Sequence, residues 1–154
     1  MKRLFLKPIH FTYFRVRRVF KPISIGVRVL LIQDNKVLMV KHSYQDGWFL
    51  VGGGAKQREN LADAARREAM EEAGATLGEM KLFGIYTKIA YRHTDHIAVF
   101  LCKDFTYTGN GDWEIDAIEL FSLDTLPENT APGIRRRIED YLAGVKPEEG
   151  FGEW

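Results

Sequence analysis

Residues 53 to 75 of this chain, GGAKQRENLADAARREAMEEAGA, decide most of what its sequence predicts. The segment opens with glycines and then becomes alanine-rich, and Glu68, Glu71 and Glu72 fall within two turns of a predicted helix. Residues three and four positions apart are neighbours on a helix, so the three carboxylates should project towards one side. Because like charges repel, such a cluster favours a bound cation, and oxygen ligands without thiolates select a hard ion such as Mg²⁺ or Mn²⁺.

The ends of this helix are also marked in the sequence. Asn60 is a good N-cap residue with Asp63 three positions later, and Gly74 stands where a helix ends in the left-handed conformation. The helix should therefore run from about Leu61 to Ala73. Its other side is small and apolar, so it can lie close against a sheet while the carboxylates face the glycine loop.

The remaining sequence predicts strands before and after this helix, and one more helix. Apolar and β-branched runs indicate strands at residues 23–32, 36–41, 48–51, 80–89, 96–105 and 118–122. A turn is expected at 93–95 between two of them, and a second helix at 131–142 with Pro132 in its first turn. This order, without a repeat or a linker, predicts a mixed β-sheet sandwiched between helices in an α/β fold.

Length and composition predict a single soluble domain. The 154 residues are 45% hydrophobic and 28% charged, and no apolar run approaches the roughly 20 residues that span a bilayer. A chain of this length buries roughly two thirds of its unfolded surface, so it needs no disulfide or structural metal ion to stabilise its fold. The single cysteine, Cys102, excludes an internal disulfide and a cysteine-based zinc site, and a cytoplasmic location is the expectation.

Residues 1–22 form a basic, aromatic arm. Seven cations and no acid lie within these residues, and the cations interrupt the apolar residues, so the arm does not have the pattern of a signal peptide. The arm could pack on its own domain or on a second subunit, which would make a homodimer. A contact with a membrane surface or with nucleic acid remains an alternative, since mixtures of basic and aromatic residues serve both. Its apolar residues are Leu4, Phe5, Ile9, Phe11, Tyr13, Phe14, Val16 and Phe20.

The fixed residues of the opening segment resemble the Nudix box at every position: Gly53-x5-Glu59-x7-Arg67-Glu68-Ala69-x-Glu71-Glu72-x-Gly74-Ala75. The resemblance implies a Nudix-type α/β/α sandwich over residues 23–144, followed by a tail at 145–154 that we expect to be loose apart from its aromatic residues. It also implies an Mg²⁺-dependent (or Mn²⁺-dependent) pyrophosphohydrolase. The substrate would be a nucleoside diphosphate linked to another moiety: a nucleotide-sugar, a dinucleoside polyphosphate or a nucleoside triphosphate.

The resemblance assigns roles to the residues of the box. The three glutamates would be metal ligands together with the backbone carbonyl of Gly53. Arg67 would pair with Glu59 or with one of the three acids and orient a ligating carboxylate. Glu59 and Gly74 would support the motif structurally. The physical reason is that water attacking a pyrophosphate needs cations that neutralise the phosphates and lower the pKa of the water.

The general base has two candidates. Some members of the family use an acid outside the box, and Glu114 is the best match here, whereas Glu71 could serve from the box itself. A third alternative is that neither acts as the base.

Residues for substrate binding are less clearly marked. Lys56 and Arg58 could contact phosphate or lie in a solvated loop, and Arg58 replaces a residue that the family uses at positive φ, so we expect a changed loop. Trp113 and Tyr91 could stack on a base or belong to the core. The alternative to an enzyme is a catalytically silent Nudix-fold module that senses a nucleotide or binds RNA.

Overall fold

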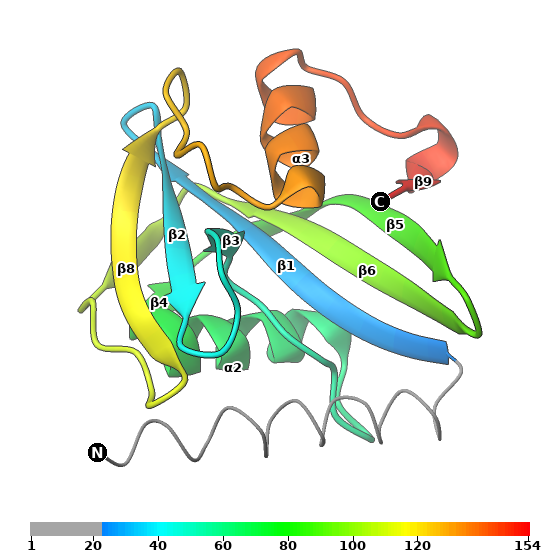
Figure 1. Cartoon of the computed structure of the whole chain (residues 1–154), viewed down its shortest axis with the longest axis horizontal. Coiled ribbons are helices and arrows are strands. Elements are labelled where there is room, and N and C mark those ends of the chain that lie inside the picture. Colours follow the sequence, from blue (N-terminus) through cyan, green and yellow to red (C-terminus); the bar gives the residue numbers. More distant parts are fainter. Residues whose placement is uncertain (1–22) are drawn as a thin grey trace.

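The computed structural model describes residues 23–154, and the predictions for the arm at 1–22 lie outside the described residues (Figure 1). Its helices are α2 (Leu61–Ala73), α3 (Pro132–Leu142) and the short 3-10 helix η1 (Glu148–Gly150). Its strands are β1 (Ile23–Gln33), β2 (Lys36–His42), β3 (Phe49–Leu50), β4 (Ala75–Leu77), β5 (Met80–Ala90), β6 (His93–Cys102), β7 (Phe105–Tyr107), β8 (Ile115–Ser122) and β9 (Phe151–Glu153).

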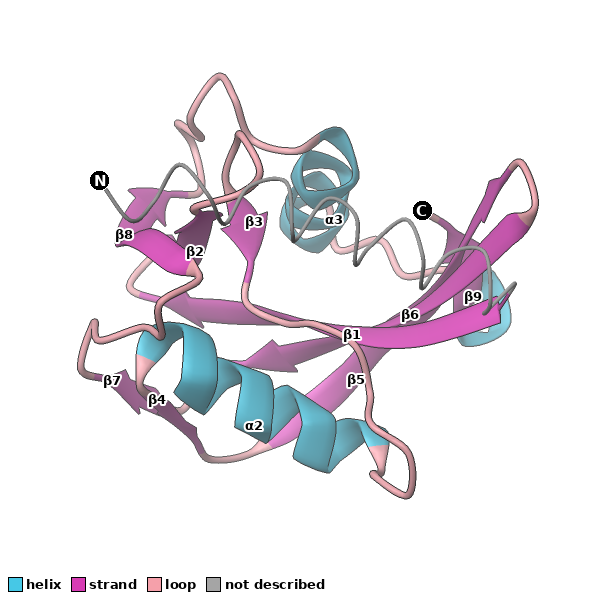
Figure 2. Cartoon of the chain, turned by 60° about the horizontal axis from the view of Figure 1, so that its bottom comes forward, coloured by secondary structure: helices cyan, strands magenta, loops and turns pink. Residues whose placement is uncertain are grey.

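A mixed seven-stranded sheet is the centre of the fold. Its order is β3-β2-β1-β6-β5-β9, and β8 pairs with β2 away from this path. The pairs β1–β6 and β5–β9 are parallel, whereas β1–β2, β2–β8 and β5–β6 are antiparallel. Helices α2 and α3 cover opposite sides of the sheet (Figures 1 and 2), which confirms the predicted α/β/α sandwich.

The core lies on both faces of β1 and β2. Successive side chains of a strand point to opposite faces, yet Val29, Leu30 and Leu31 are all fully buried, as is the run from 37 to 40 in β2. Helix α2 contributes small side chains such as Ala65, Ala69 and Ala73, which let it approach the sheet closely.

The ends of α2 agree with the sequence prediction. The Asn60 side chain accepts a hydrogen bond of 2.8 Å from the Asp63 backbone N–H, and Gly74 ends the helix at φ 59°. The Gly74 N–H donates to the Met70 carbonyl at 3.0 Å. Both caps are local in sequence, which is why they could be predicted.

Two strand predictions are wrong. The turn between β5 and β6 consists of Tyr91 and Arg92, with Arg92 at φ 63°, and β6 already begins at His93. The predicted strand 96–105 also divides: β6 ends at Cys102, and β7 pairs with β4 in a separate two-stranded sheet. This small sheet joins segments about 30 residues apart, a non-local pairing that the pattern of each strand does not specify.

Residues 151–154 at the C-terminus are held in place, as expected for the aromatic Trp154 but not for a strand that includes Gly152 and Glu153. Strand β9 pairs with β5, and the Trp154 N–H donates to the Thr87 carbonyl at 3.0 Å. The indole of Trp154 meets Tyr86 edge-on at 6.2 Å between ring centroids, and a Cβ at Gly133 would lie 2.3 Å from its Nε1. Arg137 donates to the Glu153 carbonyl at 2.8 Å, so the last residues are held between β5 and α3.

Replacing Trp154 tests this C-terminal contact. We expect Trp154→Ala to lower the free energy of unfolding by about 2 kcal/mol, because it removes a partly buried aromatic ring from Tyr86 and Gly133. Urea denaturation followed by circular dichroism measures the change. Phe151→Ala is the control, since Phe151 is exposed on β9, just before Trp154, and should change stability little. Equal effects of the two substitutions would contradict the account.

Candidate active site

The glycine loop lies along the edge of β1 and is held there by backbone hydrogen bonds. The Val27 N–H donates to the Gly53 carbonyl at 2.9 Å, and the Ala55 N–H donates to the Ile25 carbonyl at 3.0 Å. Gly52 has φ 142°, and a Cβ there would lie 2.1 Å from the Val27 carbonyl oxygen. Glycine at 52 is therefore required for this close approach.

Gly53 brings the loop against the first acid of the helix. A Cβ at this position would lie 2.7 Å from both carboxylate oxygens of Glu68. Because Gly53 has no side chain, the Glu68 carboxylate lies against the loop backbone. The oxygen atoms of Glu68 and of the loop are thereby brought close together, as ligands of one metal ion would have to be.

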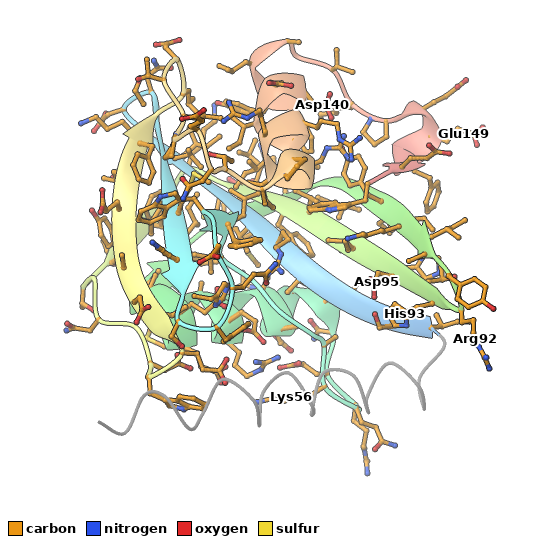
Figure 3. The ribbon with its side chains drawn as sticks, viewed as in Figure 1. Lys56, Arg92, His93, Asp95, Asp140 and Glu149 are labelled. Atoms are coloured by element: carbon orange, nitrogen blue, oxygen red, sulfur yellow. The ribbon has the colours of Figure 1, made fainter. Side chains whose placement is uncertain are left out.

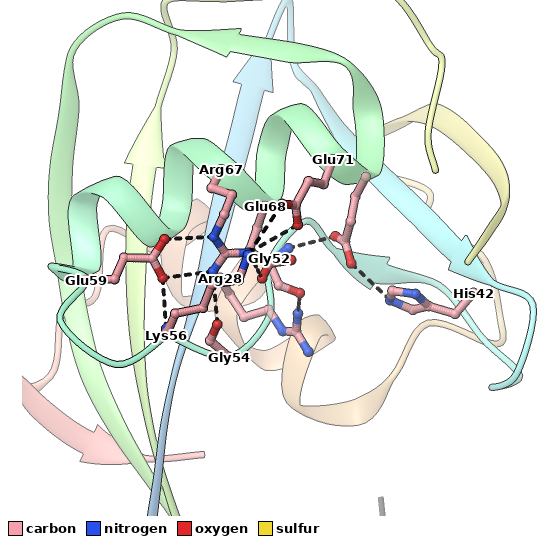
Figure 4. A network of polar contacts seen from close by, with 10 residues as sticks. Arg28, His42, Gly52, Gly54, Lys56, Glu59, Arg67, Glu68 and Glu71 are labelled. Carbon is pink, nitrogen blue, oxygen red and sulfur yellow. Dashed lines mark hydrogen bonds and ion pairs between the residues drawn. The ribbon is translucent and has the colours of Figure 1, made fainter. Parts of the chain in front are cut away.

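Arg67 organises the acids around this loop (Figure 4). Its guanidinium donates to both oxygens of Glu59, at 2.7 and 2.9 Å, and to the Gly54 carbonyl at 3.1 Å. Its Nη1 lies 2.6 Å from Glu68 Oε1 and 3.1 Å from Glu71 Oε2. The hydrogen bond from Arg67 lowers the pKa of Glu59 to about 2. The predicted pairing of Arg67 with Glu59 is thus present, and the same guanidinium also reaches two of the three acids.

Glu72 is turned away from the other two acids into a buried site. Its Oε2 accepts a hydrogen bond of 2.8 Å from the Gly52 N–H, and its Oε1 lies 3.7 Å from His42 Nε2. Burial raises the pKa of Glu72 to about 8 and lowers that of His42 to about 4, so both groups favour their uncharged forms. A cation near Glu72 would oppose this shift because it stabilises the carboxylate.

Three residues next to Glu72 were not identified from the sequence: Arg28, His42 and Tyr44. The Arg28 guanidinium donates to the Gly52 carbonyl, and its charge also lowers the pKa of His42. The rings of Tyr44 and His42 lie 5.1 Å apart. Burial, with the charges of Glu114 and Glu72, raises the pKa of Tyr44 to about 12. A charged residue within the apolar run of β1 was the one sequence signal that could have pointed to Arg28.

The loop after β7 places Glu114 beside this site. The Asp112 N–H donates to the Glu71 carbonyl at 2.8 Å, and the Ser43 N–H donates to the Glu114 carbonyl at 2.8 Å. The Asp112 side chain in turn accepts a hydrogen bond of 3.0 Å from the Glu114 N–H. The loop is thereby fastened to the end of α2 and to the end of β2. Trp113, between the two acids, has an exposed side chain.

The other residues predicted to bind substrate lie in two places: Lys56 and Arg58 are in the glycine loop, and Tyr91 is in the β5–β6 turn. Lys56 Nζ lies 3.8 Å from Glu71 Oε1, so this lysine belongs to the cluster. Arg58 is exposed in the same loop and adopts φ 65°, so the arginine takes up the positive φ and the expected change of loop shape is not required. Tyr91 lies in the β5–β6 turn with 93% of its surface exposed, and no contact in the described chain joins it to the acids of α2.

One sequence expectation about the acids needs correction. The three carboxylates do not project to a single side: Glu68 and Glu71 face Arg67, whereas Glu72 faces Gly52. Within residues 23–154, no three His, Cys, Asp or Glu side chains form a group that could hold a metal ion as they stand. The donor set nevertheless fits a hard cation, because it consists of oxygen atoms and because one cationic nitrogen already lies between Glu68 and Glu71.

Comparison with known proteins agrees with this geometry. A family model described as the NUDIX domain matches residues 22–141. This chain belongs to the NUDIX family. The crystal structure of a MutT NUDIX hydrolase from Burkholderia pseudomallei has a similar fold, with a TM-score of 0.69 and 24% identity over 76% of this chain and 96% of that one.

Two curated NUDIX relatives differ in their named substrates. Diphosphoinositol polyphosphate phosphohydrolase 2 of Rattus norvegicus is 34% identical over 83 residues, which are 53% of this chain and 44% of the relative. The chain therefore spans less than half the length of that relative. A putative 8-oxo-dGTP diphosphatase of Bacillus subtilis is 25% identical over 118 residues, which are 77% of this chain and 78% of the relative.

The Glu59–Arg67 pair of this NUDIX chain predicts a pH dependence of stability. The folded pKa of Glu59 lies near 2 and its ordinary value is 4.5, so between these values the unfolded state binds a proton that the folded state does not. The stabilisation is present above about pH 4.5 and is lost as the pH falls towards 2. We expect the loss of unfolding free energy in Glu59→Gln to be largest at neutral pH and to shrink over that range.

Urea denaturation of both proteins at several pH values measures this difference. Glu128→Gln is the control, since Glu128 is exposed and outside the cluster. A gap between wild type and Glu59→Gln that stays constant down to pH 2 would rule out the assigned role of the pair.

Proposed function

We propose that this chain is a divalent-metal-dependent NUDIX pyrophosphohydrolase that cleaves the pyrophosphate bond of a nucleoside diphosphate linked to another moiety. The observation that carries the proposal is the position of Arg67 Nη1 between the Glu68 and Glu71 carboxylates, next to the backbone of the glycine loop. One cation is already shared by two acids there, beside the backbone of the glycine loop. Mg²⁺ or Mn²⁺ bound by these acids would neutralise phosphate charge and lower the pKa of the attacking water.

Different residues would bind the metal ion, orient its ligands and bind the phosphates of the substrate. Glu68 and Glu71, with Glu72 and the Gly53 carbonyl, would hold the metal ion. Arg67 keeps the first two carboxylates oriented towards the loop, and its own position is fixed by both oxygens of Glu59. Lys56 and Arg58, which are exposed in the loop, supply positive charge for the phosphates of the substrate.

Two acids are placed to accept the proton of the attacking water. The Glu71 carboxylate is 43% exposed at the edge of the cluster, so water reaches it directly. Glu114 approaches from the loop after β7, and its charge acts on Tyr44 beside Glu72. Both residues are candidates for the general base, because their side chains are more exposed to water than the buried side chain of Glu72.

What two of the relatives share supports the proposed cleavage of a diphosphate unit. One relative is named for diphosphoinositol polyphosphates and another for 8-oxo-dGTP, and a diphosphate unit is common to both. The cluster around Arg67 suits that unit, whereas the second moiety must be recognised elsewhere. A panel of nucleotide-sugars, dinucleoside polyphosphates, nucleoside triphosphates including 8-oxo-dGTP, and diphosphoinositol polyphosphates would identify the substrate from the masses of the products.

Removing one carboxylate charge at a time tests the metal assignment. With the substrate found in the panel, we expect Glu68→Gln, Glu71→Gln and Glu72→Gln each to lower turnover roughly a hundredfold or more with the fold intact, because a neutral amide holds the cation poorly. Assays in Mg²⁺ and in Mn²⁺, with circular dichroism for the fold, measure this. Glu79→Gln is the matched control, since Glu79 is exposed outside the cluster. Near-normal activity of the three variants would refute the assignment.

The pH dependence of turnover separates the two candidate bases. If Glu114 is the base, Glu114→Gln should lower the rate roughly 10²-fold or more and remove the acidic limb of the pH–rate profile. An unchanged rate and limb would transfer the role to Glu71. If the chain instead binds the panel nucleotides without cleaving any of them, it is a sensing module.

A further inference from the structure

One end of the sheet exposes apolar side chains that the active site does not use. Ile89, at the end of β5, is 81% exposed, and Tyr91 in the following turn is 93% exposed. Ile23, the first residue of β1, is 62% exposed, and Ile25 follows on the same strand. Monomeric proteins commonly expose single apolar residues, whereas a group of them marks an interaction site.

The strand register shows that these residues form one surface. Ile23 pairs with Thr94 of β6, and Thr94 pairs with Ile89 of β5, so all three side chains leave the same face of the sheet. Two strand spacings separate Ile23 from Ile89, about 10 Å. Lys88, on the other face of β5, and the turn residues Tyr91 and Arg92 lie at the same end of the sheet. We call these three residues, together with Ile23, Ile25 and Ile89, the sheet-end surface.

The charges of the sheet-end surface are positive. Arg92 points outward from the turn (Figure 3), and the exposed Lys88 leaves the opposite face of β5 from Ile89. The nearby acid Asp95 is engaged by Ser24 and by His93, whose Nε2 lies 2.5 Å from Asp95 Oδ1. A second acid, Glu153, pairs with Thr87 in the same row as Ile25, so it borders the sheet-end surface on the side away from the β5–β6 turn.

The sequence that enters β1 has the same character. Arg17, Arg18 and Lys21 precede Ile23, and residues 1–22 contain seven cations and no acid. Like charges therefore oppose a contact between two copies of the sheet-end surface. An anionic partner would attract the positive charges of both the sheet-end surface and residues 1–22.

The apolar residues decide which anionic partner fits. Nucleic acid is bound by cations and by aromatic rings that stack on bases, and three exposed isoleucines have no partner there. A lipid bilayer accepts aliphatic side chains and a tyrosine below its headgroups, while lysine and arginine extend to the phosphates. Within residues 23–154, the helices lack the length and apolar character needed to cross a membrane, so the contact would be made from one side.

We propose that the sheet-end surface docks on an anionic membrane, with Ile23, Ile89 and Tyr91 entering the headgroup region and Lys88 and Arg92 contacting lipid phosphates. The side chains of this surface take no part in the hydrogen bonds that organise Arg67 and the acids of α2, although the Ile25 carbonyl accepts a hydrogen bond from the Ala55 N–H of the glycine loop. Docking by this end of the sheet is thus a property separate from the proposed hydrolysis.

Vesicle binding by the full chain tests the proposal. Co-sedimentation with phosphatidylcholine vesicles that contain phosphatidylserine should show binding that weakens as salt is added, and pure phosphatidylcholine should bind far less. Arg92→Gln should weaken binding about fivefold, because one cation near the membrane surface is lost. Ile89→Ser should weaken it about tenfold through lost apolar burial. The matched control is Leu82→Ser with Arg136→Gln, which changes an exposed leucine on β5 and an exposed arginine on α3.

Several results would overturn the proposal. Vesicle binding that is unchanged in Ile89→Ser and Arg92→Gln, and lost only on deletion of residues 1–20, would place the membrane contact in the arm. The same two variants losing self-association in analytical ultracentrifugation, without any vesicle binding, would make the surface an interface between copies. Loss of binding to a single-stranded oligonucleotide instead of vesicles would identify nucleic acid as the partner.

Discussion

The guanidinium of Arg67 is the constraint on which the site depends. Among residues 23–154 it is the one cation that contacts Glu59, Glu68, Glu71 and the Gly54 carbonyl together, and it therefore joins both ends of α2 to the glycine loop. Without it, Glu68 and Glu71 would repel each other one helical turn apart. A planar group with five donors can satisfy several acceptors at once, which a lysine ammonium at the same position cannot reproduce.

The loop and the helix depend on each other in this arrangement. Hydrogen bonds to β1 hold the glycine loop, and the absence of a side chain at Gly53 lets Glu68 reach its backbone. On the far side, Glu72 accepts from the Gly52 N–H and is buried against His42. The acids of one short helix thus occupy two environments: Glu68 and Glu71 lie beside Arg67, whereas Glu72 is buried, and this burial raises its pKa.

Distance along the chain separates the predictions that succeeded from those that failed. The caps of α2 and the Arg67–Glu59 pair depend on residues at most eight positions apart, and both agree with the structure. The β5–β6 turn and β9 depend on pairing between strands, and both differ from what was expected. Alternation along a strand shows which residues can share a face, but it does not specify the partner strand or the register.

The sequence by itself determined the helix Leu61–Ala73, its caps, its row of acids and membership of the family, because these depend on local spacing and residue type. Only the tertiary structure decided the direction of Glu72, the placement of Glu114 and the docking of Trp154. Each of these depends on a partner brought from a distant strand or loop: His42, Ser43 and Thr87 respectively. Such non-local neighbours set the hydrogen bonding and burial of a side chain. The order of residues in the sequence does not specify which neighbours these are.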